Sequence, residues 1–278
     1  MATYKEKVGT SVVNYAGNYL GAVEGELWYD STNKDFKYQY LNVSTSGSWR
    51  TGNNMNTARN NLMGAGTQTA ALKFGGRSPN TGATEAYNGT TWTTLPASMN
   101  NARSQGGGSG VQTSALAYAG ETPDNTRNLT ESWNNTAWSN VATLSVPRNG
   151  ASGNAGVSNT SALCFGGGGP DPKANESWNG TSWTELGDLN TGRYNLSGSG
   201  TATTALAYGG TAGPPVYALT ESWNGTSWIN VQNMNTGTDD MATGGTNTNA
   251  LSFGGNPGSV VTEEWYGDGI LTETFTTS

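Results

Sequence analysis

The sequence predicts an all-β protein built from tandem repeats. The element Glu-x-Trp-Asn-Gly-x-x-Trp recurs about every 45 residues, a period typical of solenoids, propellers and arrays. A short apolar run that ends at a pair of small residues, mostly Gly-Gly, precedes each copy. No stretch shows the helical period of 3.6 residues, whereas short apolar runs bounded by turn residues recur throughout, as expected of strands.

The repeats define the domain organisation. Residues 1–56 form an N-terminal segment, and the five repeats span 57–100, 101–145, 146–190, 191–235 and 236–278. In the third repeat, a Gly-containing strand is followed by the apolar strand 161–165, the strand 175–178 and the returning strand 181–186. The pattern therefore predicts four short strands in each repeat.

The Asn-Gly pair predicts the turn between the last two strands of each repeat. With Asn179 and Gly180 at the centre of a two-residue type I′ turn, Glu176 lies opposite Trp183. Trp178 and Trp183 then lie diagonally across the hairpin on one face, within aromatic reach. We expect this Trp pair to pack against an adjacent sheet. The recurrent structural positions are Glu85, Glu131, Glu176, Glu221, Trp133, Trp138, Trp178, Trp183, Trp223 and Trp228.

An arginine opens each of the first four repeats. These residues are Arg59, Arg103, Arg148 and Arg193, and the fifth repeat has Thr238 and Asp239 instead. A ring of arginines for ligand binding is the alternative; we expect instead that each arginine pairs with a neighbouring carboxylate such as the repeat glutamate. Recurrent glycines in the first strand of each repeat suggest close backbone approach, as around a central channel.

Composition excludes several classes of function. The chain has no His and one Cys, so the commonest general base, an intramolecular disulfide and a Cys cluster for zinc are all missing. Cys164 is expected to be a passive strand residue. The net charge of -7 disfavours nucleic acid and anionic membranes as partners. Only 33% of the residues are hydrophobic, but ten Trp and twelve Tyr provide material for a core. We expect no cofactor, no metal, no secretion signal and no membrane insertion.

The combination of an entry Arg, a Gly pair, Glu-x-Trp/Tyr and a second Trp resembles the kelch repeat. The resemblance covers residues 57–278 and implies a β-propeller of four-stranded blades. Glu26 to Tyr29 and Trp49 to Asn56 resemble the third and fourth strands of a repeat, so we expect residues 8–56 to add a sixth blade. In the alternative, they complete the blade begun by residues 236–255, giving five blades.

A second resemblance concerns the N-terminal segment. Residues 23–31, Val-Glu-Gly-Glu-Leu-Trp-Tyr-Asp-Ser, resemble N-terminal segments of virion and tail-fibre proteins of marine tailed phages. This implies a non-enzymatic virion component, made in the host cytoplasm, that serves in assembly and in adhesion to the host surface. Its expected partners are other virion proteins or further copies of itself, with a host-surface glycan or protein as the adhesion target. The alternatives are a non-viral carbohydrate- or protein-binding kelch module and a glycan-active enzyme.

The loops after the Gly pairs vary most between repeats, and variable loops on a rigid scaffold commonly carry recognition. We expect them to gather on one rim of the propeller. Surface loops without a ligand are the alternative. The candidate ligand-binding residues are Arg77, Asp124, Arg127, Asp171, Lys173 and Tyr217.

Overall fold

The computed structural model describes the strands at 13–15, 27–30 and 35–38, and residues 53–77, 79–125, 127–150, 152–256 and 261–267. The chain divides into two compact units, Met1–Thr51 and Gly52–Ser278. In the first unit, β1 (Val13–Tyr15) pairs in parallel with β2 (Leu27–Asp30), which pairs antiparallel with β3 (Asp35–Tyr38).

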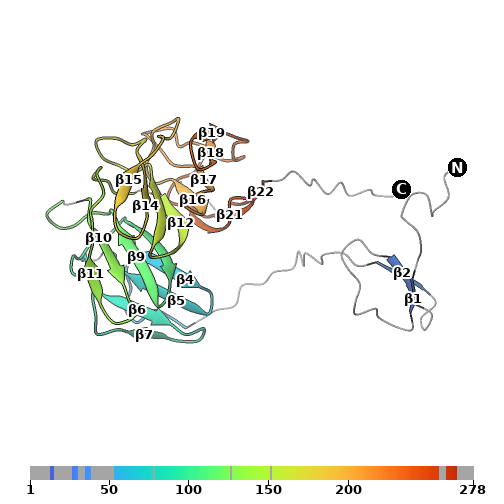
Figure 1. The fold of residues 1–278 in the computed structure, drawn as a ribbon, viewed down its shortest axis with the longest axis horizontal. Helices are drawn as coiled ribbons and strands as arrows, with labels where there is room; N and C mark the ends of the chain where they lie inside the picture. The colour runs from blue at the N-terminus through green and yellow to red at the C-terminus, as the bar shows by residue number, and fades with distance from the viewer. Residues whose placement is uncertain are drawn as a thin grey trace. The chain divides into compact units, whose positions relative to one another are not determined.

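The second unit contains five antiparallel sheets, one from each repeat (Figure 1). The first two are β4 (Met63–Thr67), β5 (Ala70–Phe74), β6 (Thr84–Tyr87) and β7 (Trp92–Thr94), then β8 (Gly107–Val111), β9 (Ser114–Tyr118), β10 (Thr130–Trp133) and β11 (Trp138–Asn140). The third and fourth are β12 (Ser152–Ser158), β13 (Ser161–Phe165), β14 (Asn175–Trp178) and β15 (Trp183–Glu185), then β16 (Ser197–Gly200), β17 (Ala205–Tyr208), β18 (Thr220–Trp223) and β19 (Trp228–Asn230). The fifth is β20 (Ala242–Gly245), β21 (Asn249–Phe253) and β22 (Thr262–Tyr266).

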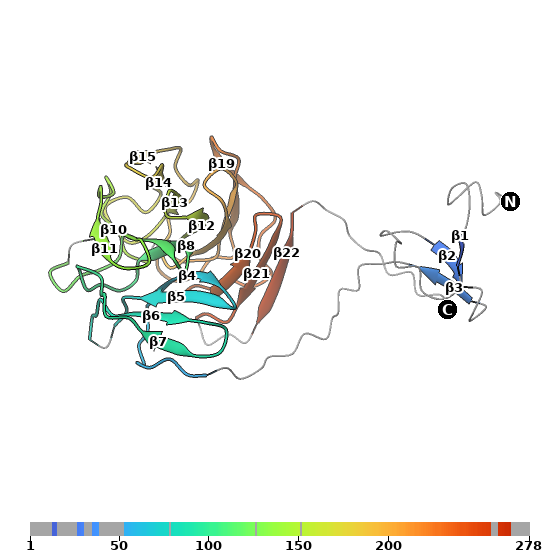
Figure 2. The same ribbon diagram turned by 60° about the horizontal axis from the view of Figure 1, so that its bottom comes forward.

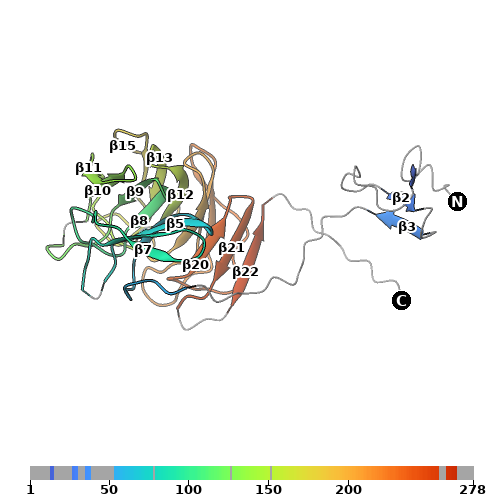
Figure 3. The same cartoon turned by 90° about the horizontal axis from the view of Figure 1, so that it is seen from below.

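The five sheets are the blades of a β-propeller. Within each sheet the strands follow chain order, as Figures 2 and 3 show for β20, β21 and β22. The first strands β4, β8, β12, β16 and β20 adjoin one another in that sequence. No helix occurs among the described residues. The prediction of an all-β propeller is therefore confirmed.

The number of blades is five, the alternative from the sequence, and the expectation of six is wrong. Leu27–Asp30 does form a strand, as its likeness to a third blade strand suggested, but it pairs with β1 and β3 in the first unit. The fifth blade takes its third strand from β22, at residues 262–266. Since β22 already pairs with β21, residues 8–56 are not needed for that strand.

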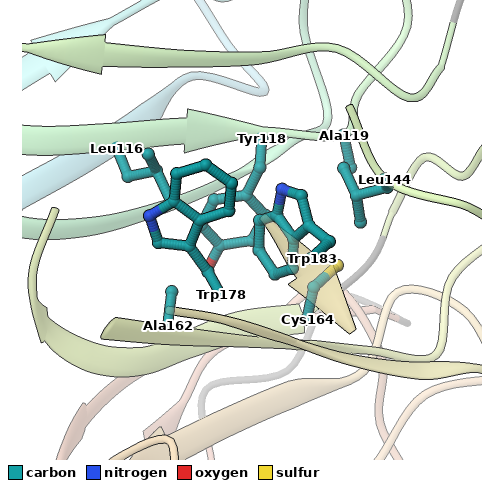
Figure 4. Close-up of a cluster of buried hydrophobic side chains, with 8 residues drawn as sticks. All are labelled: Leu116, Tyr118, Ala119, Leu144, Ala162, Cys164, Trp178 and Trp183. Atoms are coloured by element: carbon teal, nitrogen blue, oxygen red, sulfur yellow. The ribbon is translucent and has the colours of Figure 1, made fainter. Parts of the chain in front are cut away.

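The core lies between neighbouring blades and is made by the paired tryptophans. Trp178 and Trp183 have ring centroids 5.5 Å apart, and Trp183 meets Tyr118 of the preceding blade edge-on at 5.2 Å (Figure 4). The Trp183 indole also donates to Thr130 Oγ1 of that blade at 2.9 Å. Trp138 repeats both contacts one blade earlier, with Phe74 and Thr84. Trp228 likewise packs edge-on against Phe165 at 4.9 Å, so the second tryptophans of the second, third and fourth blades each contact the blade before.

The hairpin register differs from the prediction. Trp178 lies directly opposite Trp183, and Glu176 lies opposite Glu185, so the loop has four residues instead of two. The cause is the Asn179 side chain, whose Oδ1 accepts hydrogen bonds from Thr181 N and Ser182 N, each at 3.0 Å. An Asn that satisfies two backbone donors stabilises the longer loop. The two indoles still share one face, because directly opposed residues of an antiparallel pair project to the same side of the sheet.

Each repeat glutamate joins the entry segment of its blade to the third strand. Glu131 Oε2 accepts the Asn100 N–H at 2.7 Å, and Glu131 Oε1 accepts the Asn101 N–H at 3.2 Å. Arg103 Nη1 lies 2.6 Å from Glu131 Oε1 in the same buried site. We call this group of interactions the glutamate clasp. The corresponding ion pairs are Arg59–Glu85 at 3.1 Å, Arg148–Glu176 at 2.5 Å and Arg193–Glu221 at 2.5 Å.

Cys164 is wholly buried within β13, in the cluster that contains Trp178 and Trp183 (Figure 4). Burial raises the pKa of this thiol to about 12, so the thiolate is not accessible near neutral pH. The part of the chain that the structure describes contains no helix long and apolar enough for a membrane span.

Candidate functional site

One backbone conformation recurs two residues after each entry arginine, and two residues after Thr238 in the fifth repeat. All five residues at this position have left-handed backbone conformations, with φ of 50° at Asn61, 58° at Gln105, 56° at Gly150, 54° at Asn195 and 54° at Asp240. Glycine and asparagine adopt this conformation at little cost, whereas other side chains are strained in it. The sequence at these positions is therefore selected partly for backbone geometry.

A series of backbone hydrogen bonds links these five residues from blade to blade. Gln105 N donates to Asn61 O at 3.0 Å, Gly150 N to Gln105 O at 2.8 Å, Asn195 N to Gly150 O at 2.8 Å, and Asp240 N to Asn195 O at 3.0 Å. We call the five linked residues the axial ring. It surrounds the end of the propeller axis at which each first strand begins.

The axial ring lines a cavity of about 380 Å³ with residues from all five blades. The lining continues with residues at the start of the inner strands, including Ser197 and Thr243, and with Leu62 just before β4. The side chains that the ring itself contributes are three amides and one carboxylate, belonging to Asn61, Gln105, Asn195 and Asp240. Amides both donate and accept hydrogen bonds, so this opening suits a neutral, hydroxyl-rich or amide-bearing ligand.

The negative charge of the axial ring is concentrated in the fifth blade. Asp240 Oδ2 accepts a hydrogen bond from Asn195 Nδ2 at 3.2 Å. Partial burial, followed by the neighbouring Asp239 carboxylate, raises the pKa of Asp240 above its usual value of 3.8. Asp239 is buried, and its Oδ1 atom has no hydrogen-bond partner among the described residues. Thr238 stands where the other four repeats have an arginine, so the fifth blade lacks the entry guanidinium at this position.

A charged cluster flanks the axial ring beside the second blade. Glu121 lies 3.2 Å from both Arg77 and Arg127, which are two of the residues predicted to bind a ligand. Asn149 Nδ2 donates to Glu121 Oε2 and to Gln105 Oε1, each at 3.3 Å. The amide of Asn149 therefore connects this cluster to the ring. Its arginines are 46% and 28% exposed, so each retains donors for a ligand.

The other predicted rim residues are engaged mainly within their own repeats. Asp124 accepts a hydrogen bond from the Thr122 hydroxyl, and Asp171 Oδ1 accepts the Lys173 N–H at 3.0 Å. Tyr217 N donates to Gly210 O at 2.8 Å. The structure thus brings Arg77 and Arg127 together at Glu121, and it places Asp124, Asp171, Lys173 and Tyr217 in three separate loops. Ligand binding by any of the six stays a prediction.

The described residues contain no group of three or more His, Cys, Asp or Glu side chains that could hold a metal ion. The buried carboxylates of Glu85, Glu131, Glu176 and Glu221 are each committed to an ion pair and to backbone donors. The arrangement can recognise and hold a polar ligand.

Sequence reasoning missed the axial ring, although a signal for it is present. The residue two positions after each entry arginine is Asn, Gln, Gly or Asn, and the fifth repeat has Asp in the same place. These residues were not predicted as a site because their side chains differ from repeat to repeat, and what they share is a left-handed backbone conformation.

Comparison with known proteins supports the fold and goes no further. No family model matches the sequence, and no curated protein matches it. A solved structure described as "Structure of YjhT" is similar over 73% of this chain and 75% of that chain, with 14% identity and a TM-score of 0.61. The similarity supports the β-propeller. The kelch and tailed-phage resemblances gain no support from these comparisons.

Proposed function

We propose that the protein is a non-enzymatic recognition module that binds its ligand at the axial ring. The observation that carries the proposal is the convergence of Asn61, Gln105, Asn195 and Asp240 on one cavity, beside the Glu121 cluster. A propeller suits a binding or structural module, since a rigid scaffold holds polar groups from several blades in fixed positions. The ligand class that fits three amides and one carboxylate is a neutral glycan, or a polar protein segment.

We further propose that this module is a virion component of a tailed phage, in a tail fibre, a tail tip or a capsid decoration. The support is the resemblance of residues 23–31 to phage virion proteins and the kelch-like pattern of the repeats. In that setting the protein is made in the host cytoplasm, assembles with other virion proteins or with itself, and presents the axial ring to the host surface. The reading frames next to its gene test this placement: frames for capsid or tail proteins are expected, and a set of metabolic genes would contradict it.

Glycine variants test binding at the ring. Gly150 shows that glycine fits the left-handed backbone at this position, so Gln105→Gly and Asn195→Gly remove amides without straining the turn. On an array of host-surface glycans, each variant should bind about tenfold more weakly, since one lost hydrogen bond to a ligand is worth about 1.4 kcal/mol.

The matched control is Thr184→Ala, at an exposed position on the outer strand β15, which should leave binding unchanged. Unchanged binding by a variant that combines Gln105→Gly and Asn195→Gly would mean that the ligand binds elsewhere on the protein. Turnover of any bound glycan would show that the protein is an enzyme.

A further inference from the structure

The second tryptophan of a blade packs against two directly opposed residues of the preceding blade. In the second blade these are Tyr118 and Thr130. The Tyr118 ring meets Trp183 edge-on (Figure 4), and the Thr130 hydroxyl accepts the Trp183 indole N–H at 2.9 Å. Trp138 makes the same two kinds of contact with the first blade. We call an aromatic residue opposed to a threonine in this way an indole receptor.

The third blade shows what the threonine contributes. There Asn175 takes its place opposite Phe165, and Trp228 still packs edge-on against the Phe165 ring at 4.9 Å. The Trp228 indole nitrogen is buried, however, and has no hydrogen-bond partner among the described residues. The aromatic residue therefore holds the indole ring, and the threonine hydroxyl is what satisfies the indole N–H.

The fourth blade presents a complete indole receptor to a cavity. Its opposed residues are Tyr208 and Thr220, and both line a cavity of about 170 Å³ between the fourth and fifth blades. The fifth repeat has no tryptophan after Trp265 in its sequence, so it does not supply the second indole of the other repeats. The Thr220 backbone N–H donates to Asn233 Oδ1 at 3.3 Å, while the Thr220 hydroxyl has no partner among the described residues.

The cavity has the size and the walls that a bicyclic aromatic ring requires. Trp265 lines it from the fifth blade, and the buried side chains of Leu206 and Ala250 complete its apolar wall. An apolar protein cavity of about 150 Å³ is large enough to bind benzene. The present cavity is larger, and it opens to the surface at the exposed amides of Gln232 and Asn235, so it can admit an indole with a polar substituent.

We propose that this cavity is a binding site for an indole-bearing ligand. The ring lies between Trp265 and Tyr208, and its N–H donates to the Thr220 hydroxyl, as Trp183 donates to Thr130. A free indole compound and a tryptophan side chain of a peptide both carry this chemistry. The site shares no residue with the axial-ring cavity, so it does not depend on the function proposed above for that ring.

Titration of the full chain with indole and with benzofuran tests the site. Benzofuran has nearly the same shape as indole, but an ether oxygen replaces the N–H group. In isothermal titration calorimetry, indole should bind about tenfold more tightly than benzofuran, because only indole can donate to the Thr220 hydroxyl. Equal affinities for the two compounds, or no binding of indole, would overturn the proposal.

N-acetyltryptophanamide distinguishes the two sources of the indole. Its two amide groups would extend to the mouth of the cavity, where the Gln232 and Asn235 amides are exposed. Tighter binding than that of indole would support the site and assign it to a peptide tryptophan. Equal or weaker binding would support the site and assign it to a free indole compound.

One hydroxyl deletion at two equivalent positions separates binding from folding. Thr220→Val should lower the affinity for indole to that for benzofuran and leave benzofuran binding unchanged. The matched control is Thr130→Val, which removes a hydroxyl that already accepts the Trp183 N–H, so it should leave both affinities unchanged. Equal weakening of both ligands by Thr220→Val would overturn the assigned hydrogen bond.

Filling the cavity provides a second test. Ala250→Leu places a larger side chain in the cavity wall, so it should abolish binding of indole and of benzofuran in a chain that still melts cooperatively. Indole binding that survives Ala250→Leu at native affinity would mean that the ligand sits elsewhere, and the proposal would then be wrong.

Discussion

At the scale of single residues, the repeat glutamate combines a buried ion pair with hydrogen bonds to the backbone of the entry segment. Glu176 is fully buried, and it binds the Ser145 and Val146 backbone N–H groups and the Arg148 guanidinium. A buried carboxylate is stable only when its oxygens are satisfied in this way. The glutamate therefore holds residues 145 and 146, which lead from the second blade into the third, against the third strand of its own blade.

Removing the charge of one clasp should destabilise the propeller strongly. In Glu176→Gln the Arg148 guanidinium stays buried without its counter-ion, and breaking a buried pair in this way costs about 3–5 kcal/mol. Glu263→Gln is the matched control, because Glu263 bonds to Asn235 N and Thr236 N but is partly exposed and has no arginine at the entry position. Urea denaturation should show a much larger loss for the first variant, and equal losses would assign the stabilisation to the backbone bonds alone.

The pH dependence of stability should include a contribution from Glu85. Burial raises the pKa of this carboxyl, but the Asn56 N–H, the Lys73 ammonium and the Arg59 guanidinium together lower it below the usual 4.5. A depressed pKa in the folded state means that the stabilisation is present above pH 4.5 and is lost as the pH falls through the folded-state value. The thermal midpoint of the native chain should therefore fall more steeply below that pH than the midpoint of Glu85→Gln. Parallel curves would contradict this contribution.

At the scale of elements, the spacing between blades is set by the glycines of the inner strands. A Cβ at Gly108 would lie 2.4 Å from Gly64 O and 3.0 Å from the Phe74 ring in the preceding blade. Gly64 holds the same place in the first blade, yet it is exposed and a Cβ there would meet only Leu72 O of its own sheet, at 3.4 Å. A glycine is thus required at position 108 by the close approach of the preceding blade, whereas Gly64 has no neighbouring blade within 4 Å of its added Cβ.

This contrast predicts different outcomes for one substitution at two equivalent positions. Gly108→Ala should destabilise the protein by about 1–3 kcal/mol, because the backbone of the first blade must move to admit the methyl group. Gly64→Ala should change stability by less than about 0.5 kcal/mol, as is usual for exposed positions. Equilibrium urea denaturation of both variants measures the difference. A similar loss for the two would mean that the first blade packs against a neighbour in solution.

The elements could be predicted from the sequence, but their registers could not. Strand type follows from short apolar runs and Gly pairs, which are local signals. The hairpin loop was predicted to have two residues because Asn-Gly favours a type I′ turn. The Asn179 side chain instead bonds to Thr181 and Ser182, a choice that depends on which backbone donors the strands leave free. The axial ring was missed for a similar reason, since its residues meet only after the blades are assembled.

At the scale of the whole molecule, the described residues pack less closely between the last and first blades than between consecutive blades. The inner-strand residues Gly64 and Gly244 are exposed, whereas Gly108 and Ser199, at the corresponding places in the second and fourth blades, are buried. The hydrogen bonds of the axial ring run from Asp240 back to Asn61, and among the described residues none joins Asn61 N to Asp240 O. The ring is thus held by four of its five junctions, and its stability rests on the clasps and tryptophan contacts between consecutive blades.

Residues 52–278 should fold without the first 51 residues, because the five sheets and the described hydrophobic clusters between blades lie within the second unit. A chain that begins at Gly52 should unfold cooperatively, with a thermal midpoint within a few degrees of that of the full chain. Its tryptophan emission should match as well, once the contribution of Trp28 and Trp49 is subtracted. Circular dichroism and fluorescence melting of both chains provide the comparison. A large drop in the midpoint would contradict the independent folding of the second unit.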